Sequence, residues 1–205
     1  MIELLLSWLR EYGYPIVFLA STLENAFPVG FLVPGEVIVL TAAAASSYVS
    51  LDPVWVAVLA AVGETVGEVV SYALGRFGGR PLVGRVCRRF PRIGSQVDAA
   101  EAYFRRRGAV ALIIGRPAWG IKAVLPVVAG MSDMPFPKTL GLVALSSAYY
   151  YPSLVAVAYA LGLGVGQLSG VTRTVGIAFA VLLAVTIVLG IAMAWRRRAR
   201  RSKTG

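Results

Sequence analysis

The strongest constraint on the fold of this chain is a set of three long apolar stretches, at residues 54–75, 138–163 and 171–195. A transmembrane helix needs about 20 consecutive apolar residues, and each stretch is long enough. Charged residues make up 15% of the 205 residues, whereas about 25% is usual for a soluble domain. We therefore expect an all-α, multi-pass membrane protein with a single domain over residues 1–205.

Two further apolar segments, residues 14–50 and 108–137, are interrupted by helix-breaking residues. Inside a bilayer, non-helical backbone is tolerated only where it is buried in protein or lines a cavity. We therefore expect each segment to form a re-entrant hairpin of two half-helices, with the two hairpins facing each other from opposite leaflets. The backbone positions expected to break these hairpins are Pro34, Gly35, Pro126 and Gly130.

The charge distribution predicts the orientation of the chain in the membrane. The net charge is +10; nine arginines fall in residues 76–107, and six basic residues fall in the tail at 196–205. Both blocks flank apolar segments, which is the pattern of a cytoplasmic face, so no nucleic-acid partner is expected. We expect a plasma-membrane protein with a basic amphipathic segment at 76–107 and a cytoplasmic C-terminus. Residues 1–13 are amphipathic and predict an interfacial helix.

A short internal similarity suggests a repeat within the chain. The stretch SYALGRFGG at residues 71–79 resembles AYALGLGVG at 158–166, at an offset of 87 residues. With both basic blocks on one side, the two helices that contain these stretches cross the membrane in opposite directions, so the repeat is inverted. Inverted repeats with broken helices are typical of alternating-access carriers. Chance similarity between two helices of narrow composition is the alternative.

The candidate site consists of the charged residues inside apolar segments, because a charge at the bilayer centre costs at least about 2.5 kcal/mol. Arginine and lysine can bind a phosphate headgroup, and acidic residues can exchange protons in a chain that has no histidine. We expect Arg116 and Lys122 to bind phosphate. We expect proton coupling or ion pairing from the acidic residues Glu24, Glu36, Glu64 and Glu68, of which Glu64 and Glu68 share one helix face. If the two hairpins meet, we expect the acids of the first to face the cations of the second.

Several properties are left open or not expected. Neither a metal site nor a cofactor is expected, because the chain has one cysteine and no histidine. No enzymatic activity is expected, since no nucleophile–base pair is evident. The tyrosines at 149–151 are expected to pack and to hydrogen-bond between helices, with a headgroup gate as the alternative. A homo-oligomer is one alternative for the oligomeric state.

Four sequence blocks together resemble the DedA family, also called the SNARE-associated or VTT-domain family. They are E…PGE…LTAAAA (24–45), GETVGEVVSYALGRFGG (63–79), AYFRRRG (102–108) and GRPAWGIKAVLPVVAGMSDMPF (115–136). The resemblance implies two facing re-entrant hairpins and transport of polyprenyl phosphates or phospholipids. It places functional acids at Glu24 and Glu36, and functional cations at Arg116 and Lys122. The family usually has arginine at the position of Lys122 and aspartate at that of Glu64.

These observations lead to an expected function with named alternatives. We expect a flippase that moves an anionic membrane lipid, with polyprenyl phosphate as the leading candidate, and that is coupled to protons. The alternatives are a proton-coupled ion antiporter, a passive lipid scramblase, and a non-transporting scaffold in which the buried charges only hold the hairpins together.

Overall fold

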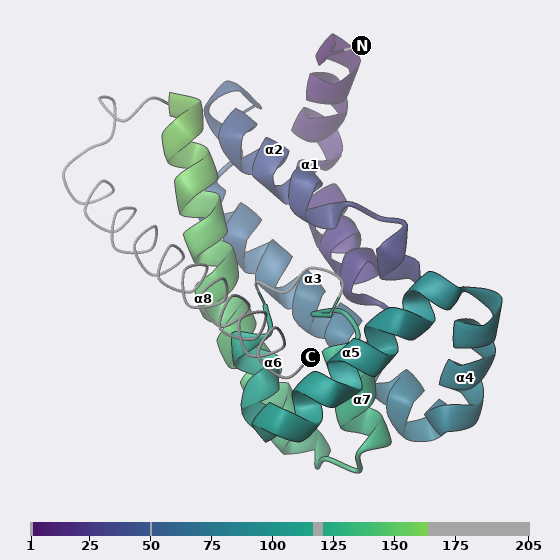
Figure 1. The fold of residues 1–205 in the computed structure, drawn as a ribbon. Helices are drawn as coiled ribbons and strands as arrows, with labels where there is room; N and C mark the ends of the chain where they lie inside the picture. Colours follow the sequence, from purple (N-terminus) through teal and green to yellow (C-terminus); the bar gives the residue numbers. More distant parts are fainter. Residues whose placement is uncertain (1, 50, 117–120, 164–205) are drawn as a thin grey trace, which may run out of the picture.

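The computed structural model describes residues 2–49, 51–116 and 121–163, and these residues are helical with no strand (Figure 1). The predicted helix at 171–195 and the basic tail at 196–205 lie outside the described residues. The α-helices are α1 Ile2–Asn25, α2 Gly35–Val49, α3 Pro53–Ala73, α4 Gly79–Arg89, α5 Pro91–Arg107, α6 Ala111–Ile114, α7 Leu125–Met131 and α8 Phe136–Leu163. Short turns of other helix types are η1 Val29–Phe31, η2 Leu74–Gly78 and η3 Gly108–Val110.

Helix α3 buries two glutamates and exposes a row of apolar side chains, which is unlike a helix on the surface of a soluble protein. Asp52 caps its N-terminus by accepting a hydrogen bond from the backbone N–H of Val54 (2.8 Å). The exposed face carries valines at every fourth position from residue 58 to residue 70, whereas Glu64 and Glu68 on the opposite face are buried. This arrangement suits a helix whose outer face contacts lipid.

Two helices are long and apolar enough to cross a membrane, and both were expected from the sequence. They are Pro53–Arg89, which continues α3 through η2 into α4, and Phe136–Leu161 within α8, with mean hydropathies of 1.6 and 1.4. Together with the apolar outer face of α3, they indicate a membrane protein. The basic segment expected at 76–107 is two helices, α4 and α5, because Pro91 lacks the N–H that a continuous helix would need.

The first broken segment contains a helix, a loop and a second helix. Helix α1 ends at Asn25 and α2 begins at Gly35, and the breaking residue Pro34 lies directly before α2. The boundary expected between an interfacial helix at 1–13 and a hairpin from residue 14 has no counterpart in the backbone, because α1 continues through Pro15. Helices α1 and α2 pack against each other, and both also contact α3.

The second broken segment is shorter and less regular. Helix α6 ends at Ile114 and α7 begins at Leu125. Pro126 lies in the first turn of α7, where a missing N–H costs little. Gly130 was expected to break the segment, but it lies inside α7. A Cβ on Gly130 would lie 2.3 Å from the carbonyl oxygen of Tyr72, so this glycine permits α7 to approach the end of α3.

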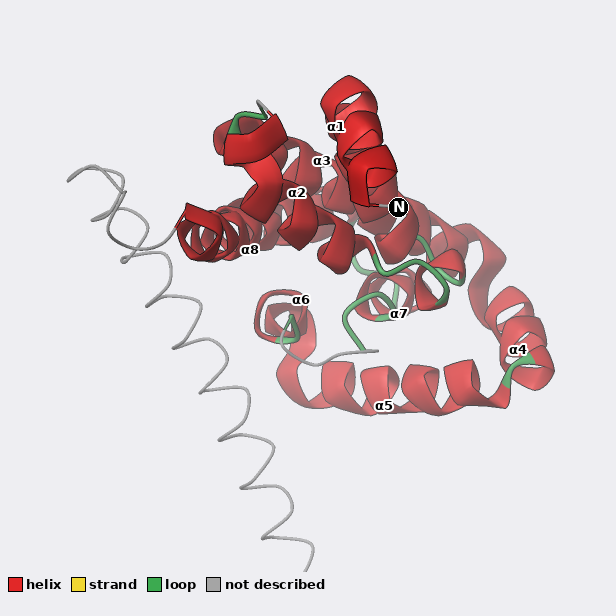
Figure 2. Cartoon of the chain, turned by 90° about the horizontal axis from the view of Figure 1, so that it is seen from above, coloured by secondary structure: helices red, strands yellow, loops and turns green. Residues whose placement is uncertain are grey.

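The helices form two layers, with the short helix α7 between them. Helices α1, α2, α3 and α8 surround one apolar core, which includes Val17, Val39, Val56 and Tyr151. Helix α7 contacts both α3 and α5, and Figure 2 shows it between the layer containing α3 and the long helix α5. Close packing of α3 on α1 depends on Gly67, where a Cβ would lie 2.3 Å from a carbonyl oxygen of α1.

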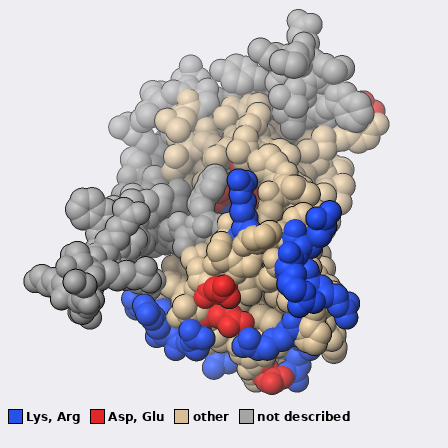
Figure 3. All heavy atoms as spheres, turned by 45° about the vertical axis from the view of Figure 1, so that its right-hand side comes forward, with Lys and Arg blue, Asp and Glu red and all other residues tan. Residues whose placement is uncertain are grey.

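Basic side chains gather at one end of the molecule. Lysine and arginine spheres are concentrated over the lower part of Figure 3, which is the end formed by α4 and α5. At this end Phe77 and Phe90 are exposed, at 87% and 53%. Exposed aromatic rings among arginines are typical of a helix at a membrane–water interface.

Candidate functional site

The first part of the site is an ion-pair cluster around Lys122. The Lys122 Nζ lies 3.1 Å from Glu24 Oε1 and also contacts Glu36 Oε1. Glu24 is in the last turn of α1, and Glu36 is in the first turn of α2. The cluster therefore connects both sides of the loop in the first broken segment to Lys122 of the second. All three side chains are largely buried, with exposures of 9–12%.

The same cluster also completes the N-terminus of α2. Glu24 Oε2 accepts a hydrogen bond from the backbone N–H of Glu36 (2.5 Å). The first N–H groups of a helix have no partner within the helix and favour a negative charge nearby. One oxygen of Glu24 therefore binds Lys122, and the other caps α2. Gly35 fits this junction because a Cβ there would lie 2.6 Å from Glu24 Oε2.

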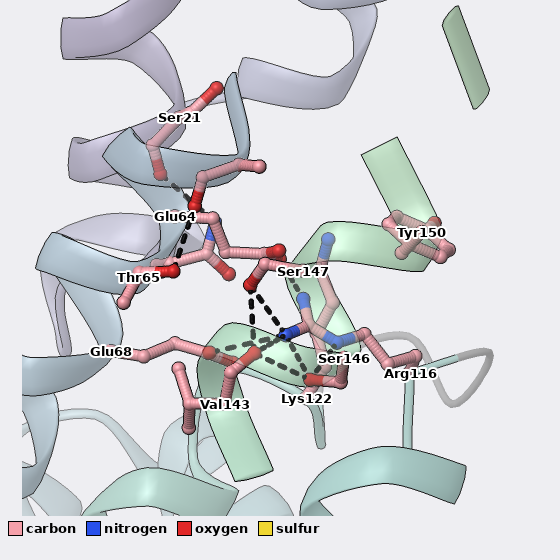
Figure 4. A network of polar contacts seen from close by, with 12 residues as sticks. Ser21, Glu64, Thr65, Glu68, Arg116, Lys122, Val143, Ser146, Ser147 and Tyr150 are labelled. Carbon is pink, nitrogen blue, oxygen red and sulfur yellow. Dashed lines mark hydrogen bonds and ion pairs between the residues drawn. The ribbon is translucent and has the colours of Figure 1, made fainter. Parts of the chain in front are cut away.

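The second part of the site is a cluster around Arg116, whose side chain is 1% exposed. Its guanidinium contacts the Glu64 carboxylate and lies 3.2 Å from Glu68 Oε2. On the other side it donates to the hydroxyl of Ser146 (2.5 Å) and to that of Ser147 (3.0 Å). Figure 4 shows Arg116 between α3, which carries the two glutamates, and α8, which carries the two serines.

Tyr150 of α8 contacts both clusters. Its ring centroid lies 5.7 Å from the Arg116 Cζ and 5.9 Å from the Lys122 Nζ, within the range of cation–π interactions. Its hydroxyl donates a hydrogen bond to Glu36 Oε1 (2.9 Å), the same oxygen that contacts Lys122. The two clusters are therefore one connected polar network inside the helix bundle.

The charges in this network do not balance. Each cation contacts two carboxylates, so two basic side chains face four acidic ones. Buried charges are stable only when they are paired and hydrogen-bonded, and an excess buried carboxylate is costly until it binds a proton or a cation. Carboxyl groups have the chemistry to exchange protons, and lysine and arginine form charge-assisted hydrogen bonds with phosphate as well as with carboxylate.

The six charged residues expected from the sequence all lie in this network, but their pairing differs from the expectation. Acids of the first broken segment were expected to face the cations of the second, and Lys122 pairs in this way. Arg116 instead pairs with Glu64 and Glu68, whose common helix face is confirmed by their shared partner. Both cations contact carboxylates in this structure, and the phosphate site expected at Arg116 and Lys122 stays a prediction.

Sequence reasoning missed the serine ligands of Arg116. Ser146 and Ser147 form a polar pair within an otherwise apolar span, and this was the available signal. Of the neighbouring tyrosines, Tyr149 and Tyr150 make the expected interhelical hydrogen bonds, whereas the buried hydroxyl of Tyr151 has no partner among the described residues.

A separate ion pair lies at the edge of the molecule, outside this network. Arg76 of η2 contacts Asp133, which follows α7 and has a φ of 55°. Both side chains are substantially exposed, at 40% and 84%. As for metal ions, the described part of the chain contains no group of three or more histidine, cysteine, aspartate or glutamate residues that could hold one.

Comparison with known proteins gives a consistent family assignment. The VTT domain family model matches residues 33–161, which include Glu36, Arg116 and Lys122 but not Glu24. An uncharacterised membrane protein of Synechocystis is 31% identical over 191 residues, 93% of this chain and 86% of that protein. No solved structure matches the chain.

Two more distant relatives have names that refer to a phosphorylated lipid or to phosphatases. Undecaprenyl phosphate transporter A of Bacillus subtilis is 22% identical, covering 92% of both chains. An alkaline phosphatase-like protein of Lactococcus lactis subsp. cremoris is 26% identical, covering 97% of this chain and 94% of that protein. With the family model matching more than half of its length, an all-helical fold and apolar spanning helices, this chain belongs to the VTT-domain family of membrane proteins, the DedA family.

Proposed function

We propose that this protein moves an anionic lipid, a polyprenyl phosphate in the first instance, from one leaflet to the other, and that protons drive the movement. The observation that carries this proposal is the charge imbalance of the buried network, in which each cation contacts two carboxylates. A network that served only to hold helices together would be most stable with matched charges. With four carboxylates around two cations, two carboxylates are in excess and are the groups that would bind protons.

The coupling follows from competition for the same cations. When a carboxyl of the Lys122 cluster takes up a proton, its hold on the ammonium group weakens. A phosphate headgroup can then take its place, with the charge-assisted hydrogen bonds that phosphate forms with lysine and arginine. Release of the proton restores the carboxylate and displaces the phosphate. The Lys122 cluster, at 9–12% exposed, is more accessible than the Arg116 cluster, so we propose that the headgroup enters at Lys122.

The membrane arrangement is part of the proposal. We propose that α1–α2 and α6–α7 form two re-entrant hairpins that enter from opposite leaflets and meet at the charged network. Helices α3 and α8 pack side by side in Figure 1 and would be the matched spans of the inverted repeat. The basic end formed by α4 and α5 would lie at the cytoplasmic surface of the plasma membrane, where anionic headgroups attract arginine.

The choice of polyprenyl phosphate is supported by the Bacillus subtilis relative, which is named for transport of undecaprenyl phosphate. The chemistry of the site agrees, since a phosphate monoester carries negative charge and three acceptor oxygens that suit lysine and arginine. We propose transport alone and assign no covalent chemistry to the network.

The test is translocation in proteoliposomes. A fluorescent short-chain polyprenyl phosphate is placed in both leaflets, and a membrane-impermeant quencher measures its movement with and without a pH gradient. We expect the purified protein to accelerate translocation over protein-free liposomes, and the gradient to change the rate. The double variant Lys122→Met/Glu36→Gln, which removes one charge of each sign and so limits unfolding, is expected to lose at least about 90% of the rate.

The matched control is Arg80→Met, which removes an equally basic side chain that is 79% exposed and pairs with Glu101 at 3.5 Å. This variant is expected to transport at the wild-type rate. Full translocation by the double variant would refute the assignment of the headgroup to Lys122. Translocation that ignores the pH gradient would identify a passive scramblase, and a wild-type rate equal to that of empty liposomes would refute transport of this lipid.

A further inference from the structure

Helices α4 and α5 carry a group of arginines that lies outside the buried network, at the basic end visible in Figure 3. Residues 76–107 contain nine arginines and only two acidic residues, Asp98 and Glu101. Arg76 and Arg80 have acidic partners. The other exposed arginines without an acidic partner in the described part of the chain are Arg85, Arg88, Arg89, Arg92, Arg105 and Arg106. An uncompensated positive surface of this kind attracts a partner of negative charge.

Two exposed phenylalanines stand at the ends of α4. Phe77 precedes the helix and is 87% exposed, and Phe90 follows it and is 53% exposed. The Arg89 Cζ lies 5.8 Å from the centroid of the Phe90 ring, so charge and apolar surface are adjacent. An anionic leaflet offers both matching parts, phosphate groups for the arginines and acyl chains below them for the rings. A soluble acidic partner would match the arginines alone. The two rings and the unpaired arginines together form the α4–α5 surface.

The backbone holds this surface in a fixed place on the fold. Gly79 has a φ of 55°, which glycine adopts readily, so the chain can turn where η2 ends and α4 begins. Phe90 is non-helical, with a φ of −131°, and Pro91 then begins α5. On their inner sides, α4 and α5 pack into the apolar core around α7 through Val83 and Ile93. The outward side is therefore a defined surface.

We propose that the α4–α5 surface binds the anionic lipid of the leaflet it lies against. Phe77 and Phe90 insert below the phosphate groups, and the unpaired arginines lie at the level of those groups. Anionic lipid is thereby enriched around the protein. This inference rests on the membrane arrangement in the proposed function, which puts α4 and α5 at a membrane surface, but it does not require that any lipid is moved.

The first test measures lipid preference. Full-length protein is placed in phosphatidylcholine vesicles with spin-labelled phosphatidylglycerol or phosphatidylcholine, and the fraction of each label immobilised by the protein is compared. We expect a preference for phosphatidylglycerol of about threefold at low salt, which falls as salt screens the charges. Arg85→Gln/Arg88→Gln/Arg89→Gln is expected to lose at least about half of this preference.

The matched control is Arg85→Lys/Arg88→Lys/Arg89→Lys, which alters the same positions and keeps their charge. Attraction to a layer of headgroups depends on charge, so this variant is expected to keep the wild-type preference. Because all three side chains are exposed, neither variant is expected to impair folding.

The second test measures the depth of the two rings. Cys87 is the one cysteine of the chain, so Cys87→Ser provides a background for single spin labels. Labels at Phe77→Cys and Phe90→Cys are expected about 5–10 Å below the phosphate groups, from their accessibility to oxygen and to a water-soluble nickel chelate. A label at Arg106→Cys is expected at the level of the phosphate groups.

The outcomes separate this inference from transport. Equal binding of the two lipids by wild type would overturn it, and so would a lysine variant that loses as much preference as the glutamine variant. Water-exposed labels at residues 77 and 90 would also overturn it and leave the arginines for a soluble acidic partner. A lipid preference without translocation would support the α4–α5 surface and count against the transport proposal alone.

Discussion

The buried Arg116 cluster allows a stability prediction that separates a structural role from a transport role. The perturbation is Arg116→Met, which keeps the apolar stem and removes the guanidinium. In the structure that group contacts Glu64, lies 3.2 Å from Glu68 and donates to two serine hydroxyls, all inside a site at most 5% exposed. Its removal leaves two buried carboxylates without a cation.

Breaking a buried ion pair by removing one partner costs about 3–5 kcal/mol, and we expect a cost in this range at alkaline pH. Neutralising the whole cluster in Arg116→Met/Glu64→Gln/Glu68→Gln removes the unpaired charges, and we expect its stability to return to within about 1 kcal/mol of wild type.

The assay is the free energy of unfolding in mixed micelles, measured by titration with a denaturing detergent at several pH values. The control is Arg80→Met, whose exposed ion pair should contribute no more than about 1 kcal/mol. A similarly small cost for Arg116→Met at alkaline pH would refute the burial on which the reasoning depends. If the stable neutral triple variant transported lipid like wild type, the Arg116 cluster would be a scaffold alone.

Two other predictions concern packing and the outer ion pair. Gly67→Ala should destabilise the protein by more than about 1 kcal/mol because its Cβ would lie 2.3 Å from a carbonyl oxygen of α1, whereas Gly141→Ala, with open space around it, should be neutral or stabilising in the same unfolding assay. Asp133→Asn keeps a residue that tolerates a φ of 55° and loses only the exposed pair with Arg76, so it should cost at most about 1 kcal/mol; Asp133→Val should cost more, and equal costs would contradict this account.

The spanning helices and the charged residues were predictable because both follow from local sequence. An apolar run of sufficient length indicates a span, and a charge within an apolar segment is costly enough to imply a buried partner. The spacing of Glu64 and Glu68 is by itself enough to place both carboxylates on one helix face. Local signals of this kind need no knowledge of which helices are neighbours.

The pairing within the network was not predictable in the same way. Which acid faces Arg116 depends on how α3 and α8 pack around it, and sequence spacing carries no information on that choice. Glycine usually disfavours a helix, yet Gly130 lies inside α7, because α7 approaches α3 too closely there for a side chain. The continuity of α1 past residue 13 likewise reflects tertiary packing of its second half, which an amphipathic pattern in the first half cannot reveal.

Glu24 connects the Lys122 cluster directly to the N-terminus of α2. One of its oxygens lies beside Lys122, and the other accepts a hydrogen bond from the first turn of α2. A single side chain therefore binds the cation and caps the helix. Under the proposed function, a headgroup that took Lys122 away from Glu24 would leave this carboxylate with the N-terminus of α2 as its partner. Binding at the ammonium group of Lys122 would therefore be felt first at the N-terminus of α2, through one shared carboxylate.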